Sequence, residues 1–120
     1  MILDVNQKQV EPDITLLEFR GRIALGRESQ RVETLVTDLI AKNQKKLVFD
    51  LSGVDYIDSA GIGILTFCFG SMKEAGGALR IANPTERVKK LLHFTHVDTF
   101  LVIFPTVEEA CQGFDASPGA

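Results

Sequence analysis

The spacing of apolar residues divides the chain into strands and helices that follow one another closely. Residues 2–9 and 14–20 have the composition of strands, and Glu11-Pro12-Asp13 between them predicts a turn that joins them as an N-terminal hairpin. From Glu28 to about Asn43, apolar side chains recur at helical spacing and predict an amphipathic helix. These side chains are Val32, Leu35, Val36, Leu39 and Ile40.

A short apolar strand and an unusually apolar helix come next. Residues 46–51 read as a buried strand, and a helix is expected to begin near Ser59. The apolar residues that recur along this helix are Ile62, Leu65, Cys68, Phe69 and Met72. Gly76-Gly77 predicts its end, because glycine accepts the left-handed dihedral angles of a helix C-cap.

A third helix is predicted after another short strand. Residues 78–82 have the pattern of the strand. Asn83 then stands as an N-cap, Pro84 as the first helical residue and Glu86 as the acid of a capping box. We expect this helix to end near Phe94.

A last strand and a short helix complete the pattern. Residues 100–104 predict a wholly apolar strand, and Thr106-x-x-Glu109 predicts a capping box that opens the helix. Residues 115–120 are expected to form a flexible tail. The order β-β-α-β-α-β-α-β-α predicts a single α/β domain over residues 1–114, with a mixed sheet, right-handed crossovers and about four helices packed mainly on one side.

Composition narrows the classes of partner. The 120 residues carry 13 Lys and Arg against 16 Asp and Glu, which argues against nucleic-acid binding because phosphate neutralisation needs a concentrated basic surface. No apolar run approaches the roughly 20 residues that span a bilayer, and the first residues lack a secretory signal, so we expect a cytoplasmic protein without membrane insertion. Cys68 and Cys111 lie far apart and are expected as reduced thiols.

Ser59 stands where the apolar strand meets the apolar helix, within Ile57-Asp58-Ser59-Ala60-Gly61. A serine at a helix start is most often an N-cap, whose oxygen accepts an amide proton and contributes about 1 kcal/mol. The free amides and the positive end of the helix dipole also favour an attached phosphate there. Ser59 is therefore both a candidate N-cap and a candidate phosphorylation site.

Motifs spread over nearly the whole chain combine into one family pattern. They are Phe19-Arg20-Gly21-Arg22-Ile23, Leu47 to Leu51, the run Tyr56 to Gly63, the Gly76-Gly77 turn, and Asn83-Pro84 before Val88. Together they resemble the STAS domain, which is named for sulphate transporters and anti-sigma factor antagonists. Within that family the chain is similar to the free-standing bacterial antagonists.

The resemblance implies partner switching controlled by phosphorylation of Ser59. In such antagonists the corresponding serine is phosphorylated by an anti-sigma factor that is a serine kinase of the histidine-kinase-like ATPase class. The unphosphorylated form captures the anti-sigma factor and frees a sigma factor, the phosphorylated form lets go, and a serine phosphatase resets the switch. The implied partner-binding residues are Gly21, Arg22, Ala24, Arg27, Asp58, Ser59, Ala60, Gly61, Ile62 and Leu65, on a monomer or weak dimer.

Two positions depart from the family pattern. Family members usually carry an acidic residue after the glycine and an aspartate three residues after it, where this chain has Arg22 and Ala24. That aspartate lies near the switch serine in the family and supports kinase engagement. The nearby Arg20, Arg22, Arg27 and Arg31 are expected either as surface charges paired with Glu18, Glu28 and Glu33, or as contacts to a partner or to a phosphate on Ser59.

The helix after Ser59 is more apolar than one buried stripe requires. Its apolar residues Ile62, Ile64, Leu65, Phe67, Cys68 and Phe69 cover most of the circumference. Burial accounts for most of them, and Ile62 and Leu65 are the expected exceptions that reach a partner at the surface.

Readings as an enzyme are weaker than readings as a binding module. His93 and His96 stand at the end of a later helix, where we expect them to cap the helix rather than to bind a metal or to activate Ser59. Gly61-x-Gly63 lacks the lysine of a phosphate-binding loop, so no cofactor is expected. The competing hypothesis is a constitutive STAS adaptor subunit that is never phosphorylated and binds a transporter ATPase or a signalling scaffold.

Overall fold

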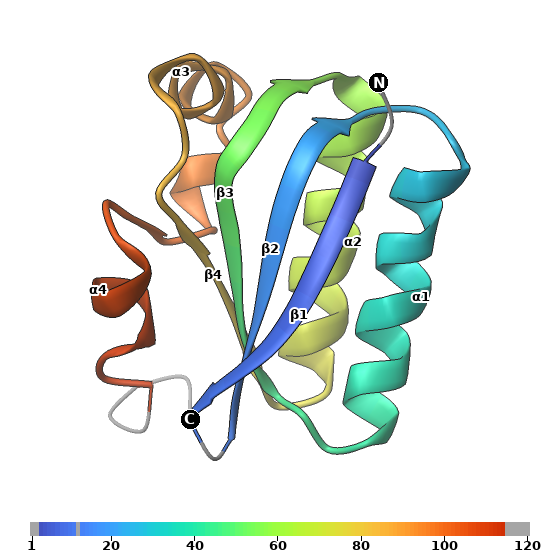
Figure 1. The fold of residues 1–120 in the computed structure, drawn as a ribbon, viewed down its shortest axis with the longest axis vertical. Coiled ribbons are helices and arrows are strands. Elements are labelled where there is room, and N and C mark those ends of the chain that lie inside the picture. The colour runs from blue at the N-terminus through green and yellow to red at the C-terminus, as the bar shows by residue number, and fades with distance from the viewer. Residues whose placement is uncertain (1–2, 12, 115–120) are drawn as a thin grey trace.

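The computed structural model describes residues 3–11 and 13–114, which form one mixed sheet with helices on both of its faces (Figure 1). The elements are β1 (Leu3–Glu11), β2 (Ile14–Ile23), α1 (Arg27–Ala41), β3 (Lys46–Ile57), α2 (Ser59–Glu74), β4 (Ala78–Ala82), α3 (Glu86–Phe94), the 3₁₀ turn η1 (Val97–Thr99), β5 (Ile103–Phe104) and α4 (Val107–Cys111). The sheet order is β1-β2-β3-β4-β5; β1 is antiparallel to β2, and all other neighbours are parallel. This confirms the predicted α/β fold with an N-terminal hairpin.

The two faces of the sheet carry unequal layers of helix. α1 and α2 lie side by side behind the sheet in Figure 1, and their apolar side chains form the main core with those of the strands. Val88 and Leu92 of α3 join the same core. α4 covers the opposite face, where Ala110 belongs to a smaller cluster with Val48. The expectation of helices mainly on one side is therefore confirmed, with α4 as the exception.

β3 is twice as long as the sequence pattern predicts, because it continues to Ile57 instead of ending at Leu51. Ser52-Gly53 interrupts the apolar run and hides the continuation. A Cβ at Gly53 would lie 2.6 Å from the carbonyl oxygen of Phe19, so only glycine lets β2 and β3 stay this close. The pairing continues to Ile23 opposite Ile57 and brings both strand ends together just before Ser59.

The start of α3 corrects the predicted capping pattern. Thr85 is the N-cap in place of Asn83, and its hydroxyl oxygen accepts the N–H of Val88 at 3.2 Å. Asn83 has a left-handed φ of 55° and donates its N–H to the carbonyl of Phe104 at 2.9 Å. Because Asn83 still belongs to the end of the β4 ladder, the helix begins only at Glu86.

The predicted strand over residues 100–104 is wrong for its first three residues. The N–H groups of Phe100 and Leu101 donate to the carbonyl of Val97, at 3.2 and 2.9 Å, as the chain leaves η1. Only Ile103 and Phe104 pair with β4. Within the described residues, the first part of β4 therefore has no neighbouring strand on this side.

α4 begins as predicted. The hydroxyl oxygen of Thr106 accepts the N–H of Glu109 at 3.1 Å. This is one of the two hydrogen bonds of the expected capping box, the one from a backbone N–H to the threonine side chain. The predicted tail at 115–120 lies outside the described residues, and the domain limits of 1–114 stay a prediction.

Gly61 controls how closely α2 approaches the sheet. A Cβ at Gly61 would lie 1.9 Å from the carbonyl oxygen of Ile23 and 2.8 Å from Cγ2 of Ile57, so any other residue would push the helix start away from the strand ends. At Gly63, one helical half-turn further on, a Cβ would meet no atom within 4 Å. A side chain would therefore clash at Gly61 but would find open space at Gly63.

We expect Gly61→Ala to lower the free energy of unfolding by at least about 2 kcal/mol, because the added methyl overlaps backbone. Gly63→Ala is the matched control in the same helix, and it should raise stability by up to about 1 kcal/mol through helix propensity. Urea unfolding of both variants measures the difference. Equal effects of the two substitutions would show that the close approach at Gly61 does not exist.

Candidate functional site at the start of α2

Asp58, rather than Ser59, is the N-cap of α2. Its Oδ1 accepts the N–H of Gly61 at 2.9 Å, while its extended backbone precedes the first helical residue. Ser59 is that first residue, and its side chain is exposed. No hydrogen bond joins its hydroxyl to another residue within 3–11 or 13–114. The predicted N-cap role of Ser59 is therefore wrong, and the hydroxyl is free at the surface.

The second oxygen of Asp58 holds the loop between β2 and α1. Oδ2 accepts the N–H of Leu25 at 3.2 Å, and the backbone N–H of Asp58 donates to the carbonyl of Ile23 at 3.3 Å. The N–H of Gly61 is the main reason why the pKa of the Asp58 carboxyl lies below its ordinary value; the N–H of Leu25 adds to the effect, and partial burial opposes it. The carboxylate therefore joins two segments that are 33 residues apart.

The loop itself is tied to α1 by a buried hydroxyl. Ser29, which is 3% exposed, accepts the N–H of Ala24 through its Oγ at 3.0 Å. Arg22, Ala24 and Asp58 line one hollow of about 280 Å³ together with Tyr56. The structure thus brings these three predicted site residues together beside the start of α2.

One expectation was that the four arginines near this hollow form ion pairs with surface glutamates. Among the described residues, they do not form these pairs. The Arg22 guanidinium lies 4.5 Å from the ring centroid of Tyr56, a cation–π contact at the surface. Arg20 lines a different hollow, with Asp50 and Ser52. Arg27 and Arg31 are exposed on the first turns of α1. Within the described part of the chain, no ion pair links any of these arginines to a carboxylate, and Glu18 pairs with Lys8 instead.

Two other predicted site residues serve the backbone. Gly21 is buried in β2 with a φ of 114°, next to an irregularity in the β2–β3 register that precedes Arg22. Gly61 is buried against Ile23. Both set the position of neighbouring side chains and offer no side chain of their own.

The apolar surface beside Ser59 differs from the predicted one. Leu65 is fully buried in the main core, so the expectation that it reaches the surface is wrong. Ile62 and Ala60 are both partly buried. Leu25 is 80% exposed and hydrogen-bonded through its N–H to Asp58, which places an unpredicted apolar side chain next to the site. Its only sequence signal was an isolated leucine between a strand and a helix.

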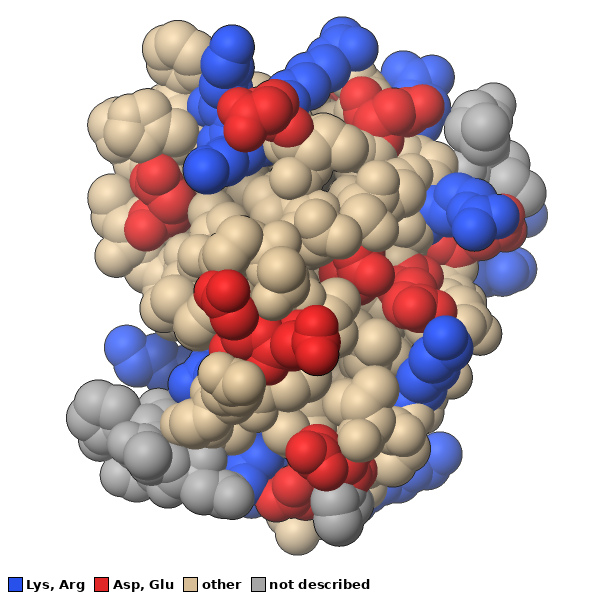
Figure 2. Space-filling view, turned by 60° about the vertical axis from the view of Figure 1, so that its left-hand side comes forward, with Lys and Arg blue, Asp and Glu red and all other residues tan. Residues whose placement is uncertain are grey.

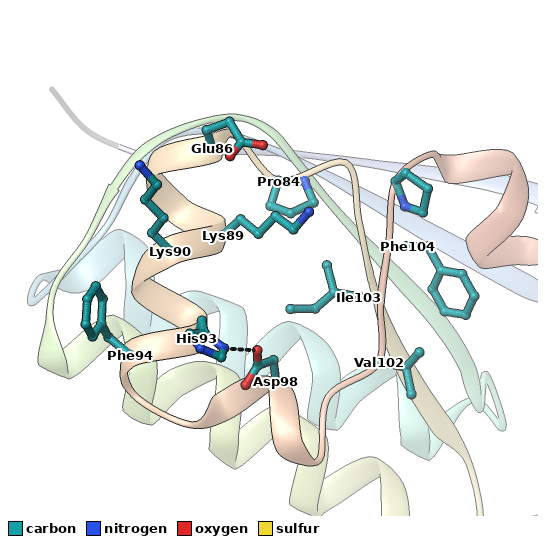
Figure 3. Close-up of a pocket in the computed structure, with 11 residues that line it drawn as sticks. Pro84, Glu86, Lys89, Lys90, His93, Phe94, Asp98, Val102, Ile103 and Phe104 are labelled. Atoms are coloured by element: carbon teal, nitrogen blue, oxygen red, sulfur yellow. Dashed lines mark hydrogen bonds and ion pairs between the residues drawn. The ribbon is translucent and has the colours of Figure 1, made fainter.

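The side of the molecule on which α3 and α4 are both visible offers a different environment (Figure 2). Figure 2 shows side chains of both charge signs intermingled across it. An open hollow of about 1130 Å³ lies between α3 and β5, where His93 and Asp98 point toward one another at 2.9 Å (Figure 3). The predicted capping of α3 holds for His96, which has a φ of 62° and donates its N–H to the carbonyl of His93 at 3.0 Å, but not for the side chain of His93, which contacts Asp98.

The described residues show no group of three or more His, Cys, Asp or Glu arranged to hold a metal ion. Burial raises the pKa of the Cys68 thiol to about 12, so this cysteine is not an activated nucleophile. Both cysteines are free, as expected. None of the described helices is long and apolar enough to cross a membrane.

We expect Asp58→Ala to lower the free energy of unfolding by about 1–2 kcal/mol, since both the helix cap and the tether to Leu25 are lost. Asp58→Asn is the matched variant, because asparagine also caps helices but carries no charge. Its deficit relative to wild type should be present above about pH 4 and disappear as pH falls through the lowered pKa of Asp58. Chemical denaturation between pH 3 and 7 tests this; a deficit that does not change with pH would contradict the role of the charge.

Comparison with known proteins agrees with this fold. A sequence model of the STAS domain matches residues 6–110. A candidate anti-sigma factor antagonist of Thermotoga neapolitana is 31% identical over 62% of this chain and 66% of its own length. The anti-sigma-B factor antagonist of Bacillus subtilis is 30% identical over 93% of this chain and 100% of its own length.

Solved structures show the same architecture. The crystal structure of a candidate anti-sigma factor antagonist from Thermotoga maritima matches with a TM-score of 0.78 at 22% identity, covering 92% of this chain and 94% of that one. The Bacillus cell fate determinant SpoIIAA in its phosphorylated form matches with a TM-score of 0.69 at 15% identity, covering 89% and 96%. The family match over most of the chain, together with this shared fold, shows that the protein belongs to the STAS domain family.

Proposed function

We propose that this protein is an anti-sigma factor antagonist that is switched by phosphorylation of Ser59. In its unmodified form it captures an anti-sigma factor that is a serine kinase of the histidine-kinase-like ATPase class, in the cytoplasm, and thereby frees a sigma factor. The kinase then phosphorylates Ser59 and releases the phosphorylated protein. A serine phosphatase removes the phosphate and so restores the form that binds. The protein itself acts by binding and not by catalysis.

The observation that carries this proposal is that the Ser59 hydroxyl is exposed and takes no part in capping α2. Asp58 supplies the capping oxygen to Gly61, so Ser59 is available to an enzyme without any loss of helix structure. The relatives named as anti-sigma factor antagonists support the general role. SpoIIAA, whose solved structure in its phosphorylated form has a similar fold, supports the proposal of a phosphate.

The physical effect of the phosphate is small within the protein and large at an interface. A phosphate adds about 1.5 to 2 negative charges, which the helix amides and dipole favour and the neighbouring Asp58 opposes, so these terms partly offset. In a partner interface without a matching cation, the same charge is desolvated and unpaired, which costs several kcal/mol. At about 1.4 kcal/mol per tenfold change in affinity, release is the expected result.

The proposed binding surface surrounds Ser59 and lies on two segments that Asp58 holds together. One segment supplies Ala60 and Ile62, and the other supplies Arg22, Ala24, Leu25 and Arg27, while the buried Gly21 and Gly61 position these segments. Leu65 is excluded by its burial. Ala24 offers no carboxylate to the partner, so Arg22 and Leu25 take the place of the acidic loop found in the family. We propose that the free protein is a monomer or weak dimer.

Substitutions of Ser59 test the switch. Ser59→Ala should bind the kinase partner as wild type does and resist release when ATP is added, because no phosphate can form. Ser59→Glu should bind at least about tenfold more weakly, because it brings a fixed negative charge into the interface. Affinities of the purified proteins for the kinase, with and without ATP, are the measurement.

Ser52→Ala is the matched control for loss of an exposed serine, and it should be released by ATP like wild type. The switch hypothesis fails if Ser59→Glu binds every native partner as tightly as wild type. That result would favour the adaptor that binds a transporter ATPase or a scaffold without phosphorylation.

Leu25 tests the proposed surface independently of the phosphate. We expect Leu25→Ser to weaken kinase binding at least about tenfold, because a large apolar side chain near the centre of an interface contributes strongly to affinity. Its stability should change by less than about 0.5 kcal/mol, since the side chain is exposed. Phe94→Ser is the matched control, because Phe94 is 78% exposed on α3, and it should bind normally. Equal losses for the two variants would contradict the placement of the surface.

A further inference from the structure

A second candidate site lies at the other end of α2, where the sheet edge is incomplete. A cavity of about 400 Å³ opens beside the first residues of β4, which β5 leaves without a neighbour. Phe69 of α2 and Phe100 form one wall, with ring centroids 5.1 Å apart. Phe104 and Phe114 also line the cavity and pack with the cluster on the opposite face of the sheet. The cavity is therefore lined largely by aromatic rings.

The charged side chains that line this cavity are all cations. They are Lys45, Lys46, Lys73 and Arg80, with no Asp or Glu among the described lining residues. Lys46 pairs with Asp13 at 2.6 Å, and Arg80 donates to the carbonyl of Ala110 at 3.0 Å. In the described part of the chain, Lys45 and Lys73 form no ion pair, so two cations beside an apolar cavity have their charge available for an anion.

The backbone adds a polar group to the same cavity. Ala78 donates its N–H to the carbonyl of Lys45, the residue before β3, at 2.8 Å, so the alternation of a parallel ladder turns the N–H of Leu79 away from β3 and toward the side of β5. The next residue on that side, Ile81, donates to the carbonyl of Val102 at 3.1 Å, whereas no loop or turn carbonyl of the described residues accepts the N–H of Leu79. Leu79 lines the cavity, and a backbone N–H is a strong donor that a ligand there can use.

We propose that this cavity binds a medium-chain carboxylate, with its alkyl chain against Phe69 and Phe100 and its carboxylate near Lys45, Lys73 and the N–H of Leu79. The volume lies within the range of small-molecule sites, about 300–1,000 Å³, and the combination of aromatic walls with few convergent polar groups is typical of them. A peptide strand is a poorer occupant, because the side of the cavity along β4 is already lined by Phe100 and Val102.

The site is separate from Ser59. Phe69 and Lys73 stand 10 and 14 residues further along α2, which is roughly 15–20 Å at the rise of an α-helix. The cavity shares Val102 and Phe104 with the hollow in Figure 3 but none of that hollow's histidine or acidic residues. Failure of this proposal therefore leaves the proposed function of Ser59 untouched.

Titration of the full chain with decanoate and with 1-decanol, below their aggregation concentrations, tests the site. Decanoate should bind at least about tenfold more tightly than 1-decanol, because only the carboxylate uses the two lysines and the backbone N–H. Isothermal titration calorimetry measures the affinities. NMR amide shifts should locate the change at Leu79, Phe100 and the end of α2.

The double variant Lys45→Gln/Lys73→Gln should lose at least about tenfold in decanoate affinity and keep its affinity for 1-decanol. Lys45→Arg/Lys73→Arg should restore decanoate binding, which shows that charge and not folding is the cause. Lys89→Gln/Lys90→Gln, on the hollow of Figure 3, is the matched control and should bind as wild type does. Equal affinity for the two ligands, no loss in the double glutamine variant, or shifts confined to the hollow of Figure 3 would each overturn the proposal.

Discussion

The candidate site depends on the hydrogen bonds that the Asp58 carboxylate accepts. One oxygen caps α2 through Gly61, and the other holds the loop before α1 through Leu25. The arrangement requires that the first turn of α2 come close to the end of β2, and the absence of a side chain at Gly61 permits it. A single acidic side chain and a single glycine therefore set the relative position of two segments that are distant in sequence.

Because Asp58 caps the helix, the Ser59 hydroxyl remains available for the phosphorylation that we propose. A serine that capped the helix would lose its hydrogen bond when modified, so phosphorylation would disturb the fold as well as the surface. Here the cap belongs to Asp58, and the serine hydroxyl points to solvent on the first helical turn. Modification then changes the charge of the surface and leaves the cap in place, which is what a reversible switch between partners requires. Leu25 and Arg22 give that surface an apolar and a basic character.

Much of the fold could be predicted because its signals are local. The periodic apolar residues of α1, the glycines after α2 and the capping pair Thr106 and Glu109 each act within a few residues, and each is found where expected. The errors arise where distant contacts decide. β3 can stay paired with β2 past Leu51 because Gly53 has no side chain where β2 lies too close for one. Phe100 and Leu101 stay outside the sheet because their N–H groups donate to the carbonyl of Val97.

The sequence predicted the junction between β3 and α2, but not which residue there caps the helix. The motif around Ser59 identified the correct junction, yet the choice between Asp58 and Ser59 as the cap depends on backbone geometry. The sequence alone does not show which of the two leucines, Leu65 or Leu25, is buried. Only the packing of α2 against the sheet shows that Leu65 is in the core and that Leu25 is at the surface.

Affinity capture of the tagged protein from its own cells, with mass spectrometry of its partners and of its phosphorylated residues, tests the central claim most directly. We expect a histidine-kinase-like ATPase among the partners and phosphate on Ser59 in the fraction that the kinase has released. Recovery of a transporter ATPase or a scaffold, with Ser59 unmodified in every fraction, would contradict it.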